Sequence, residues 1–120
     1  MRYLCLIHCS DAQMASGVPP QDMARFVNAH LDYDDALRAT GQLVATEALE
    51  SAHSAAIVRV RQGKLWVTDG PFAETSEQLG GFYLVDAASD EDAAHIAAGI
   101  PSARVGSIEL RPVAQAEHAP

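Results

Sequence analysis

A stretch of about twenty residues without glycine or proline lies between the pair Pro19-Pro20 and Gly41. The two prolines preset the backbone angles for a helix start, and glycine suits the position just after a helix end. At about 100° per residue, one sector of this stretch collects the apolar side chains and one histidine. The members of that sector are Met23, Phe26, Val27, His30, Tyr33 and Leu37. The pattern predicts one long amphipathic helix with His30 on its buried stripe.

The segments around this helix are typical of short β-strands and one further helix. A loop is expected around Gly17, before the long helix. Elsewhere in the chain, turn residues separate several short runs that are apolar or alternate between apolar and polar residues. Single strands are expected at residues 2 to 8, 42 to 49, 80 to 86 and 104 to 111, and a hairpin at 55 to 61 and 64 to 69 around Gln62-Gly63. Ser89, followed by Asp92 three residues later, predicts the start of a second helix that ends near Gly99.

This order predicts an α+β fold, ferredoxin-like βαββαβ with an extra β-hairpin. Its length of 120 residues fits a single domain, which we place at residues 1–113, followed by a flexible tail at 114–120. The helices would cover one face of the sheet, and a chain this short has no third layer for the other face. We therefore expect a homodimer that pairs through its sheet faces.

Charge and hydropathy disfavour several classes of function. Sixteen acidic residues against eight dispersed basic ones give a net charge of −8, whereas binding to nucleic acid rests largely on lysine and arginine. The N-terminal apolar run from Tyr3 to Ile7 is too short for a signal peptide or a membrane span. We expect a cytoplasmic protein that binds neither nucleic acid nor membranes.

Metal and cofactor signatures are also missing from the sequence. Cys5 and Cys9 lie too far apart on an extended strand to bridge, and buried thiols are the simpler interpretation. His53, His95 and His118 show no metal-ligand spacing, and no phosphate loop or dinucleotide fingerprint occurs. We expect no metal and no cofactor.

The segment from Val67 to Asp86, VTDGPFAETSEQLGGFYLVD, contains the tetrapeptide Asp69-Gly70-Pro71-Phe72. It resembles the DGPF-type branch of the YCII-related family, and the resemblance extends to the opening MRYLCLIH and to the close from Ile100 to Val113. The resemblance implies a ferredoxin-like protomer in a dimeric α/β barrel. It also implies a histidine and an aspartate suspected of catalysis, which match His30 and Asp69 here.

The residues leave several roles open. A histidine paired with a carboxylate is a sensible general acid/base, but Asp34 lies one helical turn after His30 and could bond the ring locally. Asp69 before a glycine is also common turn chemistry. The remaining pocket candidates are Tyr33, Phe72, Tyr83 and His8; at position 8 the family resemblance implies a tyrosine, from which His8 departs. Aromatic residues at such spacing commonly pack instead of lining a cavity.

Two functions follow from this site. The first is a cofactor-free enzyme, isomerase-like or lyase-like, that acts on a small molecule through His30 and Asp69. The second is a non-catalytic dimeric module that binds a ligand or serves a partner protein, since proteins of the DGPF type are often linked with sigma-factor-like transcription regulators.

Overall fold

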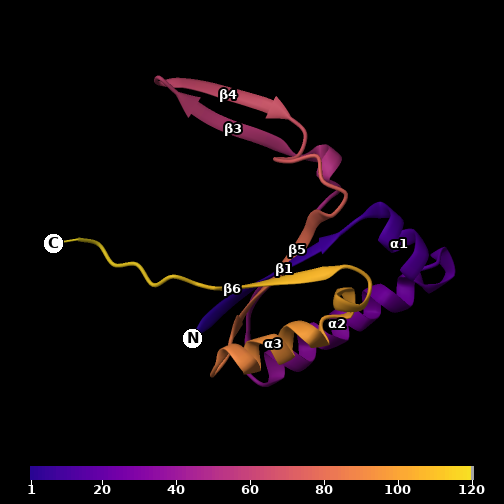
Figure 1. Cartoon of the computed structure of the whole chain (residues 1–120). Helices are drawn as coiled ribbons and strands as arrows, with labels where there is room; N and C mark the ends of the chain where they lie inside the picture. The colour runs from indigo at the N-terminus through magenta and orange to yellow at the C-terminus, as the bar shows by residue number, and fades with distance from the viewer. Residues whose placement is uncertain (120) are drawn as a thin grey trace.

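The main sheet of the protein has four antiparallel strands in the order β2-β5-β1-β6 (Figure 1). The structure is a computed structural model that describes residues 1–119. The strands are β1 (Arg2–Cys9), β2 (Leu43–Ala48), β5 (Gln78–Asp86) and β6 (Ser107–Pro112), and the helices are α1 (Asp11–Gly17), α2 (Met23–Ala39) and α3 (Asp90–Gly99). Short 3₁₀ helices are η1 (Pro20–Asp22), η2 (Ala52–Ser54) and η3 (Pro101–Arg104). This order confirms the predicted ferredoxin-like α+β architecture.

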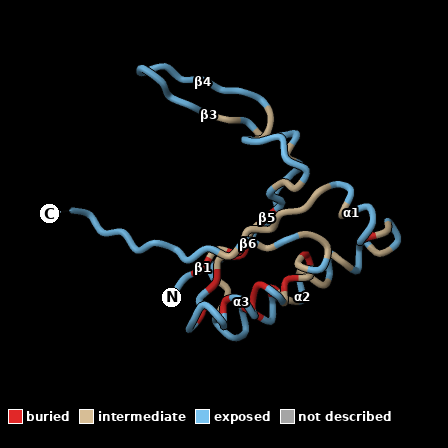
Figure 2. The backbone as a smooth tube through the Cα atoms, viewed as in Figure 1, coloured by how far each residue is buried: buried red, intermediate tan, exposed pale blue. Residues whose placement is uncertain are grey.

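The core lies between the sheet and helices α2 and α3. Alternate residues of the two central strands point into it, with Tyr3 and Cys5 on β1 and Tyr83 and Val85 on β5 all almost fully buried (Figure 2). Helix α3 packs Ala93, Ile96 and Ala97 onto this face, and Leu37 of α2 and Ile100 complete the cluster. A single apolar layer therefore joins both helices to the sheet.

The predicted helix ends hold in the structure. Helix α2 follows the proline-led η1 turn, and Gly41 after it has a φ of 75°, which glycine adopts without strain. The side chain of Ser89 accepts a hydrogen bond from the backbone N–H of Asp92, which confirms the cap of α3. The apolar stripe of α2 is narrower than predicted, because Met23 and Val27 at its edge are 39% and 49% exposed.

The expected loop around Gly17 is wrong, because residues Asp11–Gly17 form helix α1. Ser10 accepts a hydrogen bond from the backbone N–H of Gln13, while the side chain of Gln13 accepts one from the backbone N–H of Ser10. This reciprocal capping box offsets the short length of the helix.

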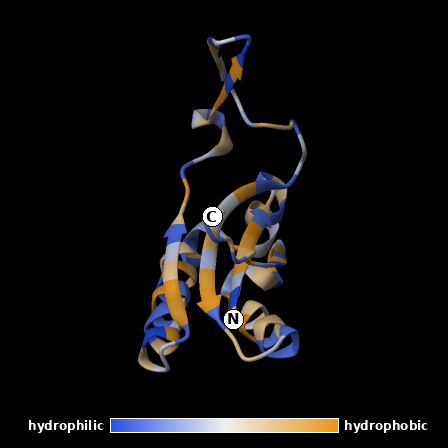
Figure 3. Cartoon of the chain, turned by 90° about the vertical axis from the view of Figure 1, so that its left-hand side faces the viewer, coloured by the Kyte–Doolittle hydropathy of each residue, from blue (hydrophilic) through white to orange (hydrophobic). Residues whose placement is uncertain are grey.

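The predicted hairpin is present but stands apart from the main sheet. Strands β3 (Ala56–Arg61) and β4 (Lys64–Asp69) pair only with each other and form the hairpin arm, residues 56–69 (Figures 1 and 3). Gln62 and Gly63 turn the chain with φ values of 51° and 74°. The arm gives the chain a radius of gyration of 16.6 Å, against about 14 Å for a compact domain of this length.

The two chain segments that lead into and out of the arm are hydrogen-bonded to each other at the edge of the main sheet. The chain leaves this sheet after β2 and returns at β5, and at that point the backbone N–H of Leu49 donates to the carbonyl oxygen of Gly80 at 2.8 Å. The arm is therefore joined to the main sheet through two adjacent, hydrogen-bonded segments, one after β2 and one in β5.

The sheet face opposite α2 and α3 carries the apolar residues that alternate with the core. Leu4 pairs with Leu84, and Leu6 pairs with Phe82. These four side chains, which we call the open face, are partly exposed, and the helices lie behind the sheet in the view of Figure 3. Beyond β6, residues 113–119 run out as an exposed segment without secondary structure, and residue 120 of the predicted tail lies outside the described residues.

Candidate functional site

His30 lies on α2 with both ring nitrogens in hydrogen bonds. Nδ1 is 2.9 Å from the backbone carbonyl oxygen of Phe26, and Nε2 is 2.7 Å from Oγ of Ser102. A carbonyl oxygen can only accept, so Nδ1 carries the proton of the neutral ring and Nε2 is free to accept from the Ser102 hydroxyl. The ring of Phe26 meets the imidazole edge-on with centroids 4.6 Å apart. These contacts fix one tautomer and one orientation of His30.

Ser102 connects His30 to a cavity. It lies in η3, which contacts both α2 and β1, and it is only 9% exposed. A cavity of about 540 Å³ opens beside it, and its lining includes Cys9, Ser10, Met14 and Gly80. We call this space the Ser102 cavity. The hydroxyl of Ser102 is thus the polar group through which His30 can influence a molecule held there.

The structure does not pair His30 with either predicted carboxylate among the residues it describes. Asp69 ends β4 in the hairpin arm, opposite Ala56, and is exposed. Asp34 is buried on α2, where its carboxylate accepts a hydrogen bond from the hydroxyl of Tyr83. Asp69 belongs to the hairpin arm, which is not part of the main sheet. The carboxylate of Asp34 instead accepts its hydrogen bond from Tyr83.

Tyr33 and Tyr83 pack in the core. The hydroxyl of Tyr33 donates to the carbonyl oxygen of Ile96 at 2.6 Å, and the two tyrosine rings lie 6.2 Å apart. Burial, reinforced by the bond to Asp34, raises the pKa of Tyr83 well above its ordinary range. Both hydroxyls are therefore held protonated as structural donors.

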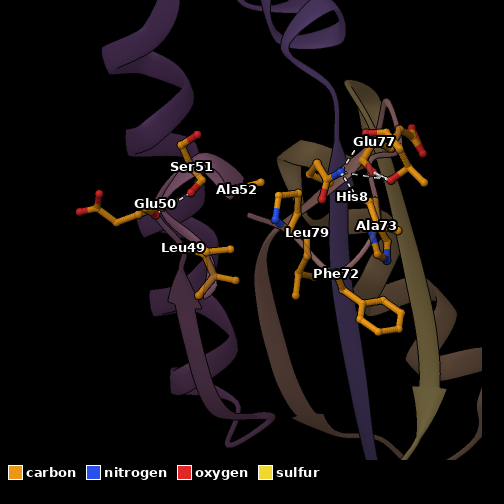
Figure 4. A pocket seen from close by; sticks show the side chains of 14 residues that line it. His8, Leu49, Glu50, Ser51, Ala52, Phe72, Ala73, Glu77 and Leu79 are labelled. Carbon is orange, nitrogen blue, oxygen red and sulfur yellow. Dashed lines mark hydrogen bonds between the residues drawn. The ribbon is translucent and has the colours of Figure 1, made fainter. Parts of the chain in front are cut away.

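His8 and Phe72, in contrast, line a second cavity at the root of the arm. This His8 cavity has a volume of about 560 Å³ and lies between the segment after β2 and the loop before β5 (Figure 4). His8 Nε2 is 2.9 Å from Oε1 of Glu109 on the neighbouring strand β6. This histidine-carboxylate pair depends on strand register, which the sequence alone did not reveal.

The sequence pattern of the YCII-related domain matches residues 1–117, which is nearly the whole chain. The chain belongs to the YCII-related domain family. It is also 45% identical over 76 residues to an uncharacterized protein, R00369, of Rhizobium meliloti strain 1021. The match covers 62% of this chain and 61% of that relative, so the chain spans about three fifths of the relative's length.

The thiols of this YCII-related chain are protonated at neutral pH. Burial raises the pKa of Cys5 to about 11, and burial with the nearby carboxylate of Glu77 raises the pKa of Cys9. Because the thiolate is the nucleophilic form, neither thiol is activated. Across residues 1–119, no group of three or more histidine, cysteine, aspartate or glutamate side chains gathers in a metal-binding arrangement.

One further property concerns membranes. No helix in the described part of the chain is long and apolar enough to cross a bilayer.

Proposed function

We propose that this YCII-related protein is a cofactor-free enzyme that moves a proton on a small molecule in the Ser102 cavity, with His30 as general base and general acid. The observation that supports it is the pair of contacts on the imidazole of His30. The backbone carbonyl of Phe26 keeps the proton on Nδ1 of His30. It thereby fills the orienting role that the sequence analysis gave to the carboxylate of Asp69. Nε2 then faces the hydroxyl of Ser102, which is one of the residues that line the cavity.

The proton passes in two linked transfers. Oγ of Ser102 takes a proton from the bound molecule while its own proton moves to Nε2 of His30. The imidazolium then returns a proton by the same route to a different atom of the molecule, so the net reaction is an isomerisation and the protein is regenerated. Imidazole suits this role because it gains and loses a proton near neutral pH.

The experiment is a screen for solvent deuterium exchange. The full chain is incubated in D₂O with a panel of small carboxylic acids and lactones, and ¹H NMR follows loss of substrate C–H signals. For a molecule that exchanges, His30→Gln is expected to slow the rate by about 10²- to 10⁴-fold, the usual contribution of a positioned acid or base. Ser102→Ala is expected to slow it too, and Ser102→Thr, which keeps the hydroxyl, to retain part of it.

The matched control is His95→Gln, a change of the same type at an exposed histidine of α3. Its exchange rate is expected to equal that of the unaltered protein. If His30→Gln exchanged as fast as the control, the catalytic role of His30 would be wrong. If Asp69→Asn slowed exchange as much as His30→Gln while Ser102→Ala did not, the original pairing with Asp69 would replace the route through Ser102.

The His8 cavity favours a second candidate, ligand binding without turnover. Its volume is in the range of small-molecule sites, and its walls combine apolar side chains such as Leu49 and Phe72 with polar ones, His8 among them. This alternative predicts that compounds of the same panel raise the melting temperature without any exchange. It also predicts that His30→Gln leaves that stabilisation intact.

A further inference from the structure

We propose a second activity for the pair formed by His30 and Ser102: the transfer of an acyl group from a neutral ester or lactone to Oγ of Ser102, followed by its hydrolysis. This activity uses the same pair as the proposed function but a different reaction, in which the serine is covalently modified. Separate assays measure the two reactions, and either can be absent while the other is present.

Ser102 and His30 have the geometry of a serine nucleophile and its general base. Oγ of Ser102 is 2.7 Å from Nε2 of His30, within the range of about 2.6 to 3.2 Å that such a pair requires. A third group normally orients the base, and here the backbone carbonyl of Phe26 does so, 2.9 Å from Nδ1. When Nε2 takes up a proton, the same carbonyl stabilises the charge on the ring. The arrangement therefore activates the Ser102 hydroxyl for attack.

The backbone holds Ser102 in place. Pro101 precedes it, and proline fixes its own φ near about −65°. The carbonyl oxygen of Ser102 accepts hydrogen bonds from the backbone N–H groups of Val105 at 3.1 Å and Gly106 at 2.9 Å. A nucleophile that is already positioned against its base loses little freedom on reaching the reactive geometry.

The lining of the Ser102 cavity favours a neutral substrate. Its volume of about 540 Å³ is in the range of small-molecule sites. Apolar side chains that could hold an alkyl or aryl group are those of Ile7, Met14, Leu49 and Leu79. Among residues 1–119, the lining also carries the carboxylates of Asp11, Glu50 and Glu74 but no lysine or arginine. These negative charges repel an acid, whereas an ester or a lactone carries no charge.

The reaction has two stages that share one base. Oγ of Ser102 bonds to the carbonyl carbon of the ester while its proton moves to Nε2 of His30. The bond from that carbon to the alcohol oxygen breaks, and the imidazolium gives its proton to the departing oxygen. Water then attacks the acyl group on Ser102, with Nε2 taking a proton from water and returning it to Oγ. The products are an acid and an alcohol, or one hydroxy acid from a lactone, and the protein is regenerated.

The first test is covalent labelling of the full chain by diisopropyl fluorophosphate, a small neutral reagent that phosphorylates activated serines and releases fluoride. Intact-mass spectrometry is expected to show one adduct per chain, and peptide mapping to place it on Ser102. The chain unfolded in guanidinium chloride is expected to stay unlabelled, because activation needs the folded contact with His30. This measurement needs no variant.

The second test compares the labelling rates of matched variants, each shown by circular dichroism to be folded. His30→Gln is expected to slow labelling by about 10²- to 10⁴-fold, and Ser102→Ala to abolish it. The controls are His53→Gln and Ser76→Ala, the corresponding removals of an imidazole and a hydroxyl from exposed residues that line the same cavity. Both controls are expected to label at the rate of the unaltered protein.

The third test concerns the class of substrate. It compares hydrolysis of p-nitrophenyl pentanoate with that of the p-nitrophenyl half-ester of succinic acid, which has a similar length but a free carboxylate. The anionic ester is expected to react about tenfold more slowly, because the carboxylates of the lining repel it. An equal or faster rate for the anionic ester would refute the preference for neutral substrates.

An unlabelled folded protein, an adduct on a residue other than Ser102, or equal labelling rates in His30→Gln and His53→Gln would overturn the proposal. Deuterium exchange that depends on His30, in a protein that is not labelled, would support the proposed function and refute acyl transfer. Labelling of Ser102 without exchange of any compound in the panel would support acyl transfer and count against the proposed function.

Discussion

The hydrogen bond between Tyr83 and Asp34 makes a sharp prediction about stability. Tyr83→Phe removes the hydroxyl and leaves the buried carboxylate of Asp34, 7% exposed, without its donor. Hydrogen bonds to charged groups contribute about 1.5 to 3 kcal/mol, and we expect a loss of about 2 to 3 kcal/mol in the free energy of unfolding. At about 2.1 cal/mol/K per residue, this corresponds to a fall in melting temperature of about 8 to 12 °C.

The assay is urea unfolding followed by far-ultraviolet circular dichroism. The fluorescence of Trp66 would not serve, because this tryptophan is 58% exposed on the arm, away from the core. The control is Tyr33→Phe, which removes a bond to the neutral carbonyl of Ile96 and should cost about 1 kcal/mol. If Tyr83→Phe cost no more than Tyr33→Phe, the importance of the Tyr83 hydroxyl as the donor to the buried side chain of Asp34 would be refuted.

Two further perturbations test the packing of the core. Burial raises the pKa of Cys5 from 9.0 to about 11, and Tyr83 shifts in the same direction, so the folded state holds these protons more tightly than the unfolded state. Stability that is fully present below pH 9 should therefore fall as the pH rises through 11, by about 3 kcal/mol in all for Cys5. Urea unfolding of Cys5→Ala, measured at several pH values, should show a smaller decline. Gly81→Ala would place a methyl group 2.8 Å from the backbone oxygen of Glu47 and should cost about 1 to 3 kcal/mol, whereas Gly80→Ala, with its nearest neighbour 4.0 Å away, should change the melting temperature little.

Local sequence signals predicted most of the fold. The bounds of α2 follow from prolines before it and a glycine after it, and the cap at Ser89 follows from a four-residue pattern. Helix α1 was missed even though Ser10 and Gln13 carry the same kind of signal, because its seven residues offer too little apolar periodicity to stand out. In a helix this short, the capping residues are the main signal that the sequence provides.

The candidate site was harder to predict from the sequence, because its contacts join distant parts of the chain. His30 and Ser102 are 72 positions apart and meet only when η3 packs near α2. His8 and Glu109 meet through the register of β1 and β6. In β4, Asp69 lies on the same face as Leu65 and Val67, as strand alternation requires, yet alternation alone cannot show that this face is uncovered. The pattern of residues in a strand predicts which side chains share a face. Which other part of the protein that face contacts depends on tertiary packing.

The closed base of the arm makes it a self-contained insertion. Leu49 and Gly80 are hydrogen-bonded close to where the chain leaves and rejoins the main sheet, so the segment between β2 and β5 is attached through two adjacent strand ends. Lengthening, shortening or replacing the residues between Leu49 and Gln78, the first residue of β5, is expected to leave the register of the four main strands unchanged. A designer could therefore graft a different hairpin onto the same joint while keeping the four-stranded scaffold.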